Sequence, residues 1–263
     1  MKFCTLASGS SGNATYLSDG DTHILIDAGV SCRAICRELS ELGVKADELS
    51  AIFITHEHGD HIKGLATLSK NAPNCCIYAT SSCAAAIEEK NPTLCGRISS
   101  VVPGVEININ SVSLVAFDTP HDTPYSVGYR VSDGNKTVMI MTDLGYIPPE
   151  IHEYLENLDL LLIEANYDED RLQYGRYPRM IKERIAGKNG HLSNSDCAKC
   201  ACEAAVAGTR RILLGHLSTE NNSPRLAYEA VHRGLLSLGV IPGVDIMLSV
   251  APRTERGELV VLE

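Results

Sequence analysis

The stretch FITHEHGDHIKG, residues 53–64, places three histidines and one aspartate within six positions, directly after an apolar run. A solvent-exposed loop does not need such side chains, because Ser, Asn or Gly would serve there. Imidazole and carboxylate groups are ligands that proteins offer to divalent metal ions. The stretch therefore predicts part of a metal site, built from His56, His58, Asp60 and His61.

The composition is that of an ordinary globular protein. The chain has 263 residues, of which 44% are hydrophobic and 21% charged. Its formal net charge of −10 argues against broad, nonspecific adhesion to nucleic acid. No apolar run approaches the roughly 20 residues of a membrane span, and the N-terminus MKFCTLASGS lacks the apolar segment of a secretory signal. We therefore expect a cytoplasmic protein.

The ten cysteines do not form the pattern of a disulfide scaffold, which suits short secreted chains. Cys75 and Cys76 are adjacent, and Cys197, Cys200 and Cys202 fall in one Ala-rich segment. Cys197 and Cys200 form a CxxC, which leaves half of a zinc site or a redox pair as an alternative. No second CxxC exists, so we favour reduced cysteines that act as small core residues.

Hydrophobic patterns predict strands alternating with helices along the whole chain. Strands are expected at 2–8, 14–20 and 22–29, and helices at 31–43 (with Ser31 as N-cap), 61–72, 148–158, 194–207 and 224–238. Residues 168–190 are polar and basic and are expected to be irregular. Two packed sheets with helices outside fit this pattern best. We expect a single domain over 1–263, with similar halves of about 1–130 and 131–263.

Further acidic and histidine residues also follow strand-like runs. Strand ends are rigid platforms from which loops can converge on a site. These residues are Asp27, His121, Asp143, Glu164 and His216. Six of the nine histidines, at positions 56, 58, 61, 121, 191 and 216, occupy such positions, so chance is a poor explanation.

The number of candidate donors indicates more than one ion. Seven nitrogen and oxygen donors are too many for one tetrahedral zinc but suit two ions that share a carboxylate. The seven are His56, His58, Asp60, His61, His121, Asp143 and His216. Two ions about 3.5–4 Å apart can stabilise both the attacking and the leaving oxygen of a hydrolytic reaction. We therefore expect a two-metal hydrolytic centre that holds Zn²⁺ or Mn²⁺.

The HxHxDH spacing, followed by later His, Asp and His residues on separate strands, resembles the metallo-β-lactamase superfamily. The resemblance implies an α/β fold, an αββα sandwich with the metal site at one edge between the sheets. It also implies that Asp27 orients the HxHxDH loop from behind the ligands; a plain turn residue is the alternative. The implied ligands are His56, His58 and His121 for the first metal, Asp60, His61 and His216 for the second, and Asp143 as the bridge.

Superfamily membership alone does not determine the substrate, because hydrolases of lactams, thioesters, lactones and phosphodiesters share the centre. Glu164 in LLIEANYD and His191 in GHLSNSD resemble a Glu and a His of the tRNA-maturing ribonuclease Z enzymes. The resemblance implies that His191 protonates the leaving oxygen and that Glu164 orients it. With Asp60, these are the expected catalytic residues. The alternative for His191 is a polar residue that simply precedes the helix start at Ser193 and Asn194.

Residues 171–191, RLQYGRYPRMIKERIAGKNGH, carry six Lys or Arg residues against one Glu, with Tyr174 and Tyr177 between them. Basic side chains interleaved with aromatic rings can neutralise phosphates and stack on bases, although a solvated face is the alternative. The turn ASGSSGN and the segment GHLSTENN could also bind phosphate, or simply cap a helix. The candidate contacts are Arg176, Arg179, Ser10, Ser11, Asn13, Ser218, Asn221 and Asn222.

Taken together, SGSSGN, HEHGDH, TPHD, TDLG, IEANYD and GHLSTENN resemble the YycJ/WalJ (also VicX) group of the superfamily. The resemblance implies a 5′→3′ DNA exonuclease linked to mismatch repair, with DNA preferred to RNA and no membrane partner. Only 72 residues separate Asp143 from His216, too few for the inserted domain of β-CASP nucleases. Two alternatives stay open: a metallo-hydrolase of small thioesters, lactones or lactams, and a non-catalytic metal-binding accessory of cell-wall signalling.

Overall fold

The computed structural model describes residues 1–263. Strand β4 (Ala51–Phe53) lies inside a seven-stranded sheet and precedes the HxHxDH loop at residues 56–61, which we call the metal loop. Strands β3 to β6 of this sheet are parallel, and β1 pairs antiparallel with β2 and with the last strand of the chain. The order across the sheet is β14 (Val260–Val261), β1 (Lys2–Gly9), β2 (Gly12–Asp19), β3 (Thr22–Ile26), β4, β5 (Cys76–Thr80) and β6 (Ile98–Val101).

A second seven-stranded sheet has the same plan, with strands β7 to β10 antiparallel and β10 to β13 parallel. The chain passes to this sheet after residue 101 and returns to the first at residue 260, whereas the sequence predicts halves that meet near residue 130. Its order is β13 (Met247–Val250), β12 (Arg211–Gly215), β11 (Leu160–Glu164), β10 (Thr137–Met141), β9 (Val127–Ser132), β8 (Val112–Asp118) and β7 (Glu106–Ile109).

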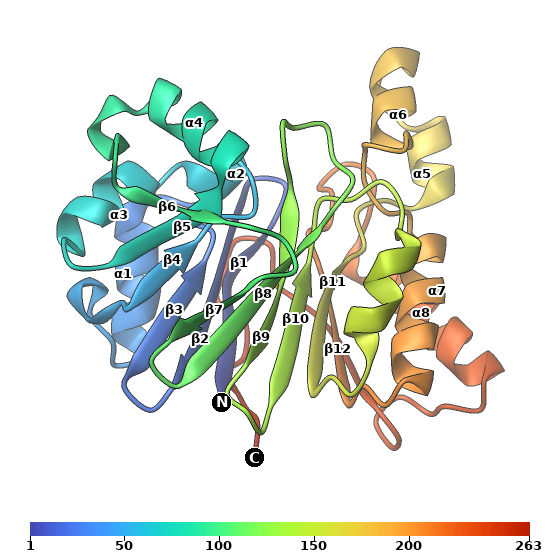
Figure 1. Cartoon of the computed structure of the whole chain (residues 1–263). Coiled ribbons are helices and arrows are strands. Elements are labelled where there is room, and N and C mark those ends of the chain that lie inside the picture. Colours follow the sequence, from blue (N-terminus) through green and yellow to red (C-terminus); the bar gives the residue numbers. More distant parts are fainter.

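Helices cover the outer face of each sheet (Figure 1). On the first sheet they are α1 (Cys32–Glu41), α2 (Gly59–Ile62), α3 (Leu65–Asn71) and α4 (Ser81–Lys90). On the second they are α7 (Asn194–Val206) and α8 (Pro224–Ser237), and short 3₁₀ helices occur at Ala46–Glu48, Pro92–Leu94 and Pro149–Leu155. None of the helices combines the length and apolarity that crossing a membrane requires.

Three hydrophobic clusters define the layers. One lies between the first sheet and its helices and includes Leu25, Ile35 and Leu68. A second lies between the other sheet and α7 and α8 and includes Leu161 and Val231. The third lies between the two sheets, where side chains such as Phe53 of β4 and Tyr129 of β9 are fully buried. This succession confirms the predicted αββα sandwich.

Several predicted helices are found in place. The Ser31 hydroxyl accepts a hydrogen bond from the Ala34 amide at 3.2 Å, so Ser31 caps α1 as expected. The helices expected at 194–207 and 224–238 correspond to α7 and α8. The helix expected at 148–158 is a 3₁₀ helix. The one expected at 61–72 is split at Gly64, where an added Cβ would lie 2.3 Å from the Val30 carbonyl oxygen.

The prediction that residues 168–190 are irregular is wrong. They form α5 (Glu169–Tyr174) and α6 (Arg179–Ile185), which rise beyond the end of the second sheet (Figure 1). The Asp168 carboxylate caps α5 by accepting from the Arg171 amide at 3.0 Å. Helix α6 buries none of its residues, so it has no apolar stripe that could have revealed it. We call residues 169–185 the arm.

All ten cysteines are free thiols, and six of them are buried. Cys197 and Cys200 both lie on the buried face of α7. Burial raises the pKa of the Cys200 thiol to about 12, so the thiolate that binds metal or exchanges disulfides is disfavoured there. The six buried cysteines therefore pack as small core residues, whereas Cys76 and Cys95 are exposed.

Candidate metal centre

The site residues lie at one edge of the two sheets, each at or just beyond the end of a strand. Asp27 follows β3, His56 follows β4 and Asp143 follows β10. Glu164 is the last residue of β11, and His216 comes directly after β12. Because β3 and β4 run parallel in one sheet and β10, β11 and β12 run parallel in the other, their ends present these side chains along the seam between the sheets.

Three of these residues adopt a left-handed backbone conformation. The φ angles are 62° at Asp27, 58° at Asp143 and 52° at His216. This region is uncommon for residues other than glycine, although Asp, Asn and His enter it more readily than most. Such strained positions cluster at functional sites, where the surrounding structure holds them.

One group of candidate ligands consists of His56, His58 and His121, each of which offers one ring nitrogen within 4.8 Å of the other two. His121 donates from Nδ1 to the Gly190 carbonyl oxygen at 3.0 Å, which leaves its Nε2 free to bind a metal. Nδ1 of His56 lies 3.1 Å from the Thr55 hydroxyl, so its Nε2 is also available. Burial lowers the pKa of His56 well below the usual value and favours the neutral ring that a metal needs.

A second group consists of Asp60, His61 and His216. The Asp60 carboxylate lies 3.6 Å from Nε2 of His61 and 3.7 Å from Nε2 of His216. Nδ1 of His61 donates to the Asp27 carboxylate at 2.7 Å. Asp27 also accepts from the Thr55 amide at 2.8 Å, and these two bonds fix the metal loop from behind the ligands.

Asp143 lies between the two groups. One carboxylate oxygen is 3.1 Å from both Nε2 of His61 and Nδ1 of His216, and the other is 3.6 Å from Nε2 of His121. Burial opposes ionisation, but the nearby His216 and His61 rings outweigh it and hold the pKa of Asp143 well below its usual value. Its two carboxylate oxygens thus face residues of both groups.

Several buried polar atoms of the cluster have no hydrogen-bond partner. They are Nε2 of His56, Oδ2 of Asp143 and both ring nitrogens of His216, on residues exposed by no more than 2%. Buried polar atoms without partners are costly, and coordination to a cation would satisfy them. The donor set is nitrogen and oxygen throughout, so these clusters are able to bind divalent metal ions.

Glu164 and His191 form a hydrogen-bonded pair beside the cluster. Nδ1 of His191 donates to Glu164 Oε1 at 2.7 Å. The other carboxylate oxygen accepts from the amides of Leu144 and Leu192 at 3.2 and 3.3 Å. Glu164 is fully buried, yet the His191 and His216 rings overcome the effect of burial and lower its pKa to about 2. His191 keeps 23% of its side chain exposed and therefore reaches the cavity at the site.

That cavity has a volume of about 280 Å³ and is lined by Tyr177, which the sequence marks as a possible stacking ring, and by others such as Asp122 and Ile185, which it did not single out. Asp122, next to His121, forms an ion pair with Arg184 of α6. Tyr177 and Ile185 of the 177–191 segment also line it. The basic run 171–191 included Arg184, but no sequence pattern placed Asp122 or Ile185 at the metal cavity.

The structure separates the candidate substrate contacts near the N-terminus. Ser10 lines the cavity at the metal cluster, and Ser11 is exposed. Asn13 is buried, and its side-chain amide lies 3.1 Å from Nε2 of His61 and 3.4 Å from the carbonyl oxygen of Asp60. Asn13 therefore supports the metal loop.

The contacts expected further along the chain are also dispersed. Arg176 is exposed, and Arg179 pairs with Glu183 while its side chain is 91% exposed. The Ser218 hydroxyl accepts a hydrogen bond from the backbone amide of Asn221 at 3.1 Å. The Asn222 side chain is engaged within the protein, donating to the carbonyl oxygen of Ala165 at 2.8 Å and bonding to Asn194.

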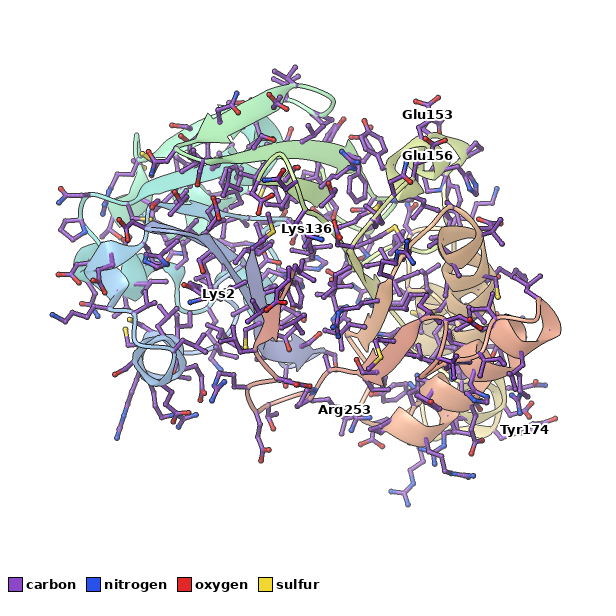
Figure 2. The ribbon with its side chains drawn as sticks, turned by 90° about the horizontal axis from the view of Figure 1, so that it is seen from below. Lys2, Lys136, Glu153, Glu156, Tyr174 and Arg253 are labelled. Carbon is purple, nitrogen blue, oxygen red and sulfur yellow. The ribbon has the colours of Figure 1, made fainter.

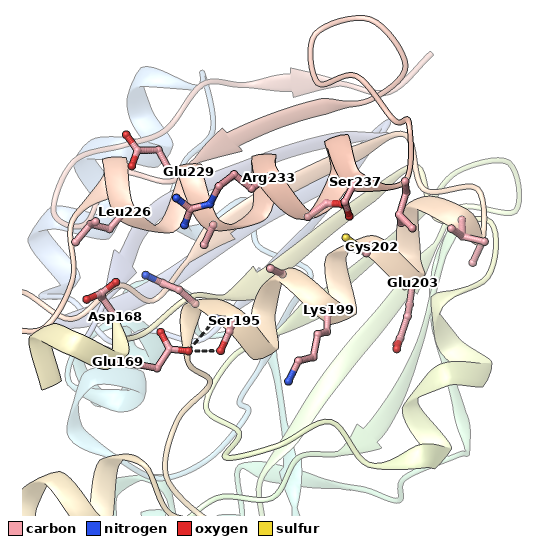
Figure 3. A pocket seen from close by; sticks show the side chains of 17 residues that line it. Asp168, Glu169, Ser195, Lys199, Cys202, Glu203, Leu226, Glu229, Arg233 and Ser237 are labelled. Atoms are coloured by element: carbon pink, nitrogen blue, oxygen red, sulfur yellow. Dashed lines mark hydrogen bonds between the residues drawn. The ribbon is translucent and has the colours of Figure 1, made fainter. Parts of the chain in front are cut away.

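A larger cavity of about 840 Å³ lies apart from the metal cluster, in the groove between α7 and α8 (Figure 3). Glu169 reaches its end and accepts a hydrogen bond from Ser195, while Lys199 and Arg233 lie along its sides. The groove contains no histidine and no group of side chains that could hold a metal. The groups of side chains that could hold a metal lie instead at the strand ends, beside the smaller cavity.

Comparison with known proteins agrees with this geometry. Residues 22–217 match the family described as "Beta-lactamase superfamily domain". The chain is 36% identical over 250 residues to exodeoxyribonuclease WalJ of Streptococcus pneumoniae, covering 93% of this chain and 92% of that protein. It is 32% identical over 242 residues to exodeoxyribonuclease YycJ of Bacillus anthracis, and the match covers 91% of this chain and 90% of YycJ.

Among solved structures, the metallo-β-lactamase fold protein YhfI of Bacillus subtilis superposes with a TM-score of 0.73. The match covers 98% of this chain and 99% of YhfI at 19% sequence identity, so it supports the fold alone. The family match and the two relatives above extend over most of the chain and include the HxHxDH loop. This chain therefore belongs to the metallo-β-lactamase superfamily and, within it, to the group that contains WalJ and YycJ.

Proposed function

We propose that the chain is a metal-dependent phosphodiesterase that removes nucleotides from the 5′ end of DNA. The pairing of Glu164 with His191 at 2.7 Å, beside the metal cluster, carries this proposal. The 3′ oxygen of a nucleotide is a poor leaving group, so its departure needs a positioned proton donor. The names of the relatives WalJ and YycJ, both exodeoxyribonucleases, support DNA as the substrate.

We further propose two Zn²⁺ or Mn²⁺ ions at the cluster. When bound, they would supply Lewis acidity and an activated water as the nucleophile. The proposed ligands are His56, His58 and His121 for one ion and Asp60, His61 and His216 for the other, with Asp143 shared.

The surrounding residues orient the substrate and move the proton. Buried Glu164 accepts Nδ1–H of His191 and stabilises the protonated ring, whose Nε2–H can pass to the leaving oxygen. Arg184 of the arm, held by Asp122 at the wall of the cavity, adds positive charge where a phosphate would lie. We also propose a role in DNA mismatch repair and a cytoplasmic location, since DNA is the proposed substrate.

The test is a degradation assay with purified protein and either Mn²⁺ or Zn²⁺. The substrates are matched DNA and RNA, single- and double-stranded, labelled at either end, with Asp143→Asn as the inactive control. Metal-dependent release of mononucleotides from the 5′ end of DNA, absent in the control, is the expected result. If the metal-loaded protein cleaves no polymer but hydrolyses a thioester, lactone or lactam, the small-molecule alternative is correct. A metal-loaded protein inert on all of these would instead indicate an accessory role.

A further inference from the structure

Another cavity, distinct from the groove between α7 and α8, adjoins the metal centre and has no role in the chemistry described so far. We call it the second cavity. Its volume is about 630 Å³, within the roughly 300–1,000 Å³ typical of ligand sites. It lies between the arm and the loop that follows His216. The arm contributes Arg171, Tyr174, Arg176 and Tyr177, and the loop contributes Glu220 and Asn221.

The two cavities meet at Tyr177, which lines both of them. The segment that begins at Tyr177 continues through Arg184 to His191 along the wall of the metal cavity. A ligand that occupies the second cavity would therefore extend directly into the metal centre. His191 lies on the arm side of the metal cavity, because its backbone amide donates to the carbonyl oxygen of Ile185 at 2.9 Å.

Asn221 presents a buried donor that nothing in the protein satisfies. The residue is only 2% exposed, and its side-chain Nδ2 has no hydrogen-bond partner although the residue lines the cavity. Its neighbour Asn222 differs, because its amide is bonded within the protein. An unpaired buried amide is costly and indicates an acceptor group that is supplied from outside.

Arg171 and Arg176 beside this amide form no ion pair, and neither do Asp170 and Glu220, the two carboxylates that line the same cavity. The ion pairs of the arm are Arg179–Glu183 and Arg184–Asp122, which leaves Arg171 and Arg176 unpaired. Arg171 instead donates to the carbonyl oxygen of Asn222 at 3.1 Å.

Arg253 donates to that same carbonyl at 3.2 Å, so two guanidinium groups share one acceptor. Burial lowers the pKa of Arg253, and the nearby positive charge of Arg171 lowers it further. A bound anion near Arg171 would offset that charge.

The cavity also offers surfaces for a base. Tyr174 is 79% exposed at the outer edge of the molecule (Figure 2), and with Tyr177 it supplies two aromatic rings. Base stacking on aromatic rings is independent of sequence. Asp170 and Glu220, which also line the cavity, can accept hydrogen bonds from exocyclic amino groups. Donors for a phosphate and rings for a base thus occur together.

We propose that this second cavity binds the 5′-terminal nucleotide of the DNA strand, with its 5′-phosphate on Arg171, Arg176 and the Asn221 amide. The inference rests on the proposed exonuclease function. Its direction follows from His191, because the leaving 3′ oxygen belongs to the terminal nucleotide and departs on the side of its proton donor. The next phosphate along the strand then lies at the metal cluster, and cleavage releases one nucleotide.

The experiment compares kcat/KM for oligodeoxynucleotides that carry either a 5′-phosphate or a 5′-hydroxyl. Hydrolysis of bis(p-nitrophenyl) phosphate, which is too small to span both cavities, reports on the metal centre alone. The variants are Arg176→Ala and Arg171→Gln. The matched control is Arg225→Ala, which removes an equal charge from an exposed position on α8.

We expect the wild-type protein to prefer the 5′-phosphate by about tenfold or more. Arg176→Ala and Arg171→Gln should lose most of this preference, mainly through a higher KM for the 5′-phosphorylated substrate. Both variants should hydrolyse the small diester at the wild-type rate. The control Arg225→Ala should keep the 5′-phosphate preference. No 5′-phosphate preference in the wild type, or an intact preference in both variants, would overturn the inference and leave the proposed function standing. A metal-loaded wild type inert on both DNA and the small diester would overturn the proposed function, and this inference with it.

Discussion

Asp143 contacts both groups of ligands, and its left-handed backbone makes the choice of substitution important. Asn tolerates this conformation, whereas Ala does not adopt it readily. We expect Asp143→Asn to lower phosphodiesterase activity by more than about 100-fold, because a neutral amide cannot replace the shared carboxylate. Activity and bound metal, measured by elemental analysis, check this.

The same position supplies its own comparison. Asp143→Ala should lose as much activity as Asp143→Asn but should also have a lower Tm, since a non-glycine residue held there without a stabilising side chain costs about 1–3 kcal/mol. Equal Tm values for the two variants would show that the backbone at this site is not strained.

His191 is held by Glu164 and lies outside the seven proposed ligands. We expect His191→Ala to lower kcat on DNA by about 10²–10⁴-fold and to leave the metal content unchanged. The loss should be much smaller on bis(p-nitrophenyl) phosphate, because p-nitrophenolate leaves without a proton. An equal loss on both substrates would contradict the role of proton donor.

At the scale of elements, the arm carries two exposed arginines next to the metal cavity: Arg176, which forms no ion pair, and Arg179, which pairs with Glu183. We expect Arg176→Glu together with Arg179→Glu to raise KM for DNA by roughly tenfold or more and to make log KM less steeply dependent on salt concentration. Steady-state kinetics at several salt concentrations test this. A small-molecule hydrolase would show no change in KM for its substrate, so this pair of substitutions also separates the two functions.

The turn between β3 and α1 packs against the metal loop without a gap. An added Cβ at Gly29 would lie 1.6 Å from the Asp60 carbonyl oxygen, so Gly29→Ala should displace the loop. We expect a loss of about 1–3 kcal/mol in stability together with weaker metal binding, measured by thermal unfolding and metal titration.

Gly59, in the same loop, has open space where its Cβ would be. Gly59→Ala is therefore the matched control and should retain both its Tm and its metal affinity. If the two variants behave alike, close packing at Gly29 is not what positions Asp60.

At the scale of the whole molecule, the proposed ligands come from both sheets. His56, His58, Asp60 and His61 follow a strand of the first sheet, whereas His121, Asp143 and His216 follow strands of the second. Bound metal would therefore connect the two sheets and stabilise the folded state. With metal at a thousand times its Kd, removal by a chelator should cost about 4 kcal/mol and lower Tm by roughly 10 °C.

Differential scanning calorimetry measures this shift, and adding Zn²⁺ or Mn²⁺ back should restore the original Tm. His191→Ala should respond to the chelator as the wild type does, because His191 is not a proposed ligand. A Tm that does not depend on metal would mean that the cluster is not a metal site.

Much of this arrangement was predictable, because each site residue follows an apolar run that the sequence identifies as a strand. The sandwich and the convergence of His56, His121 and Asp143 follow from such patterns. The arm was not predictable as helical, since α6 buries nothing and so lacks periodicity. Nor could the sequence distinguish Asn221 from Asn222, because only packing decides which amide finds a partner.

The left-handed conformations at Asp27, Asp143 and His216 also constrain how the centre could change during evolution. Metal sites often diversify by exchanging one ligand type for another, such as Glu or Cys for Asp. At the proposed ligands Asp143 and His216, and at Asp27 behind them, a new side chain must also accept a positive φ, which favours Asp, Asn, His and Gly over β-branched and larger residues. The backbone thus restricts the set of accessible ligands before any metal preference acts, and new chemistry would arise more readily from the loops and the arm than from these strand ends.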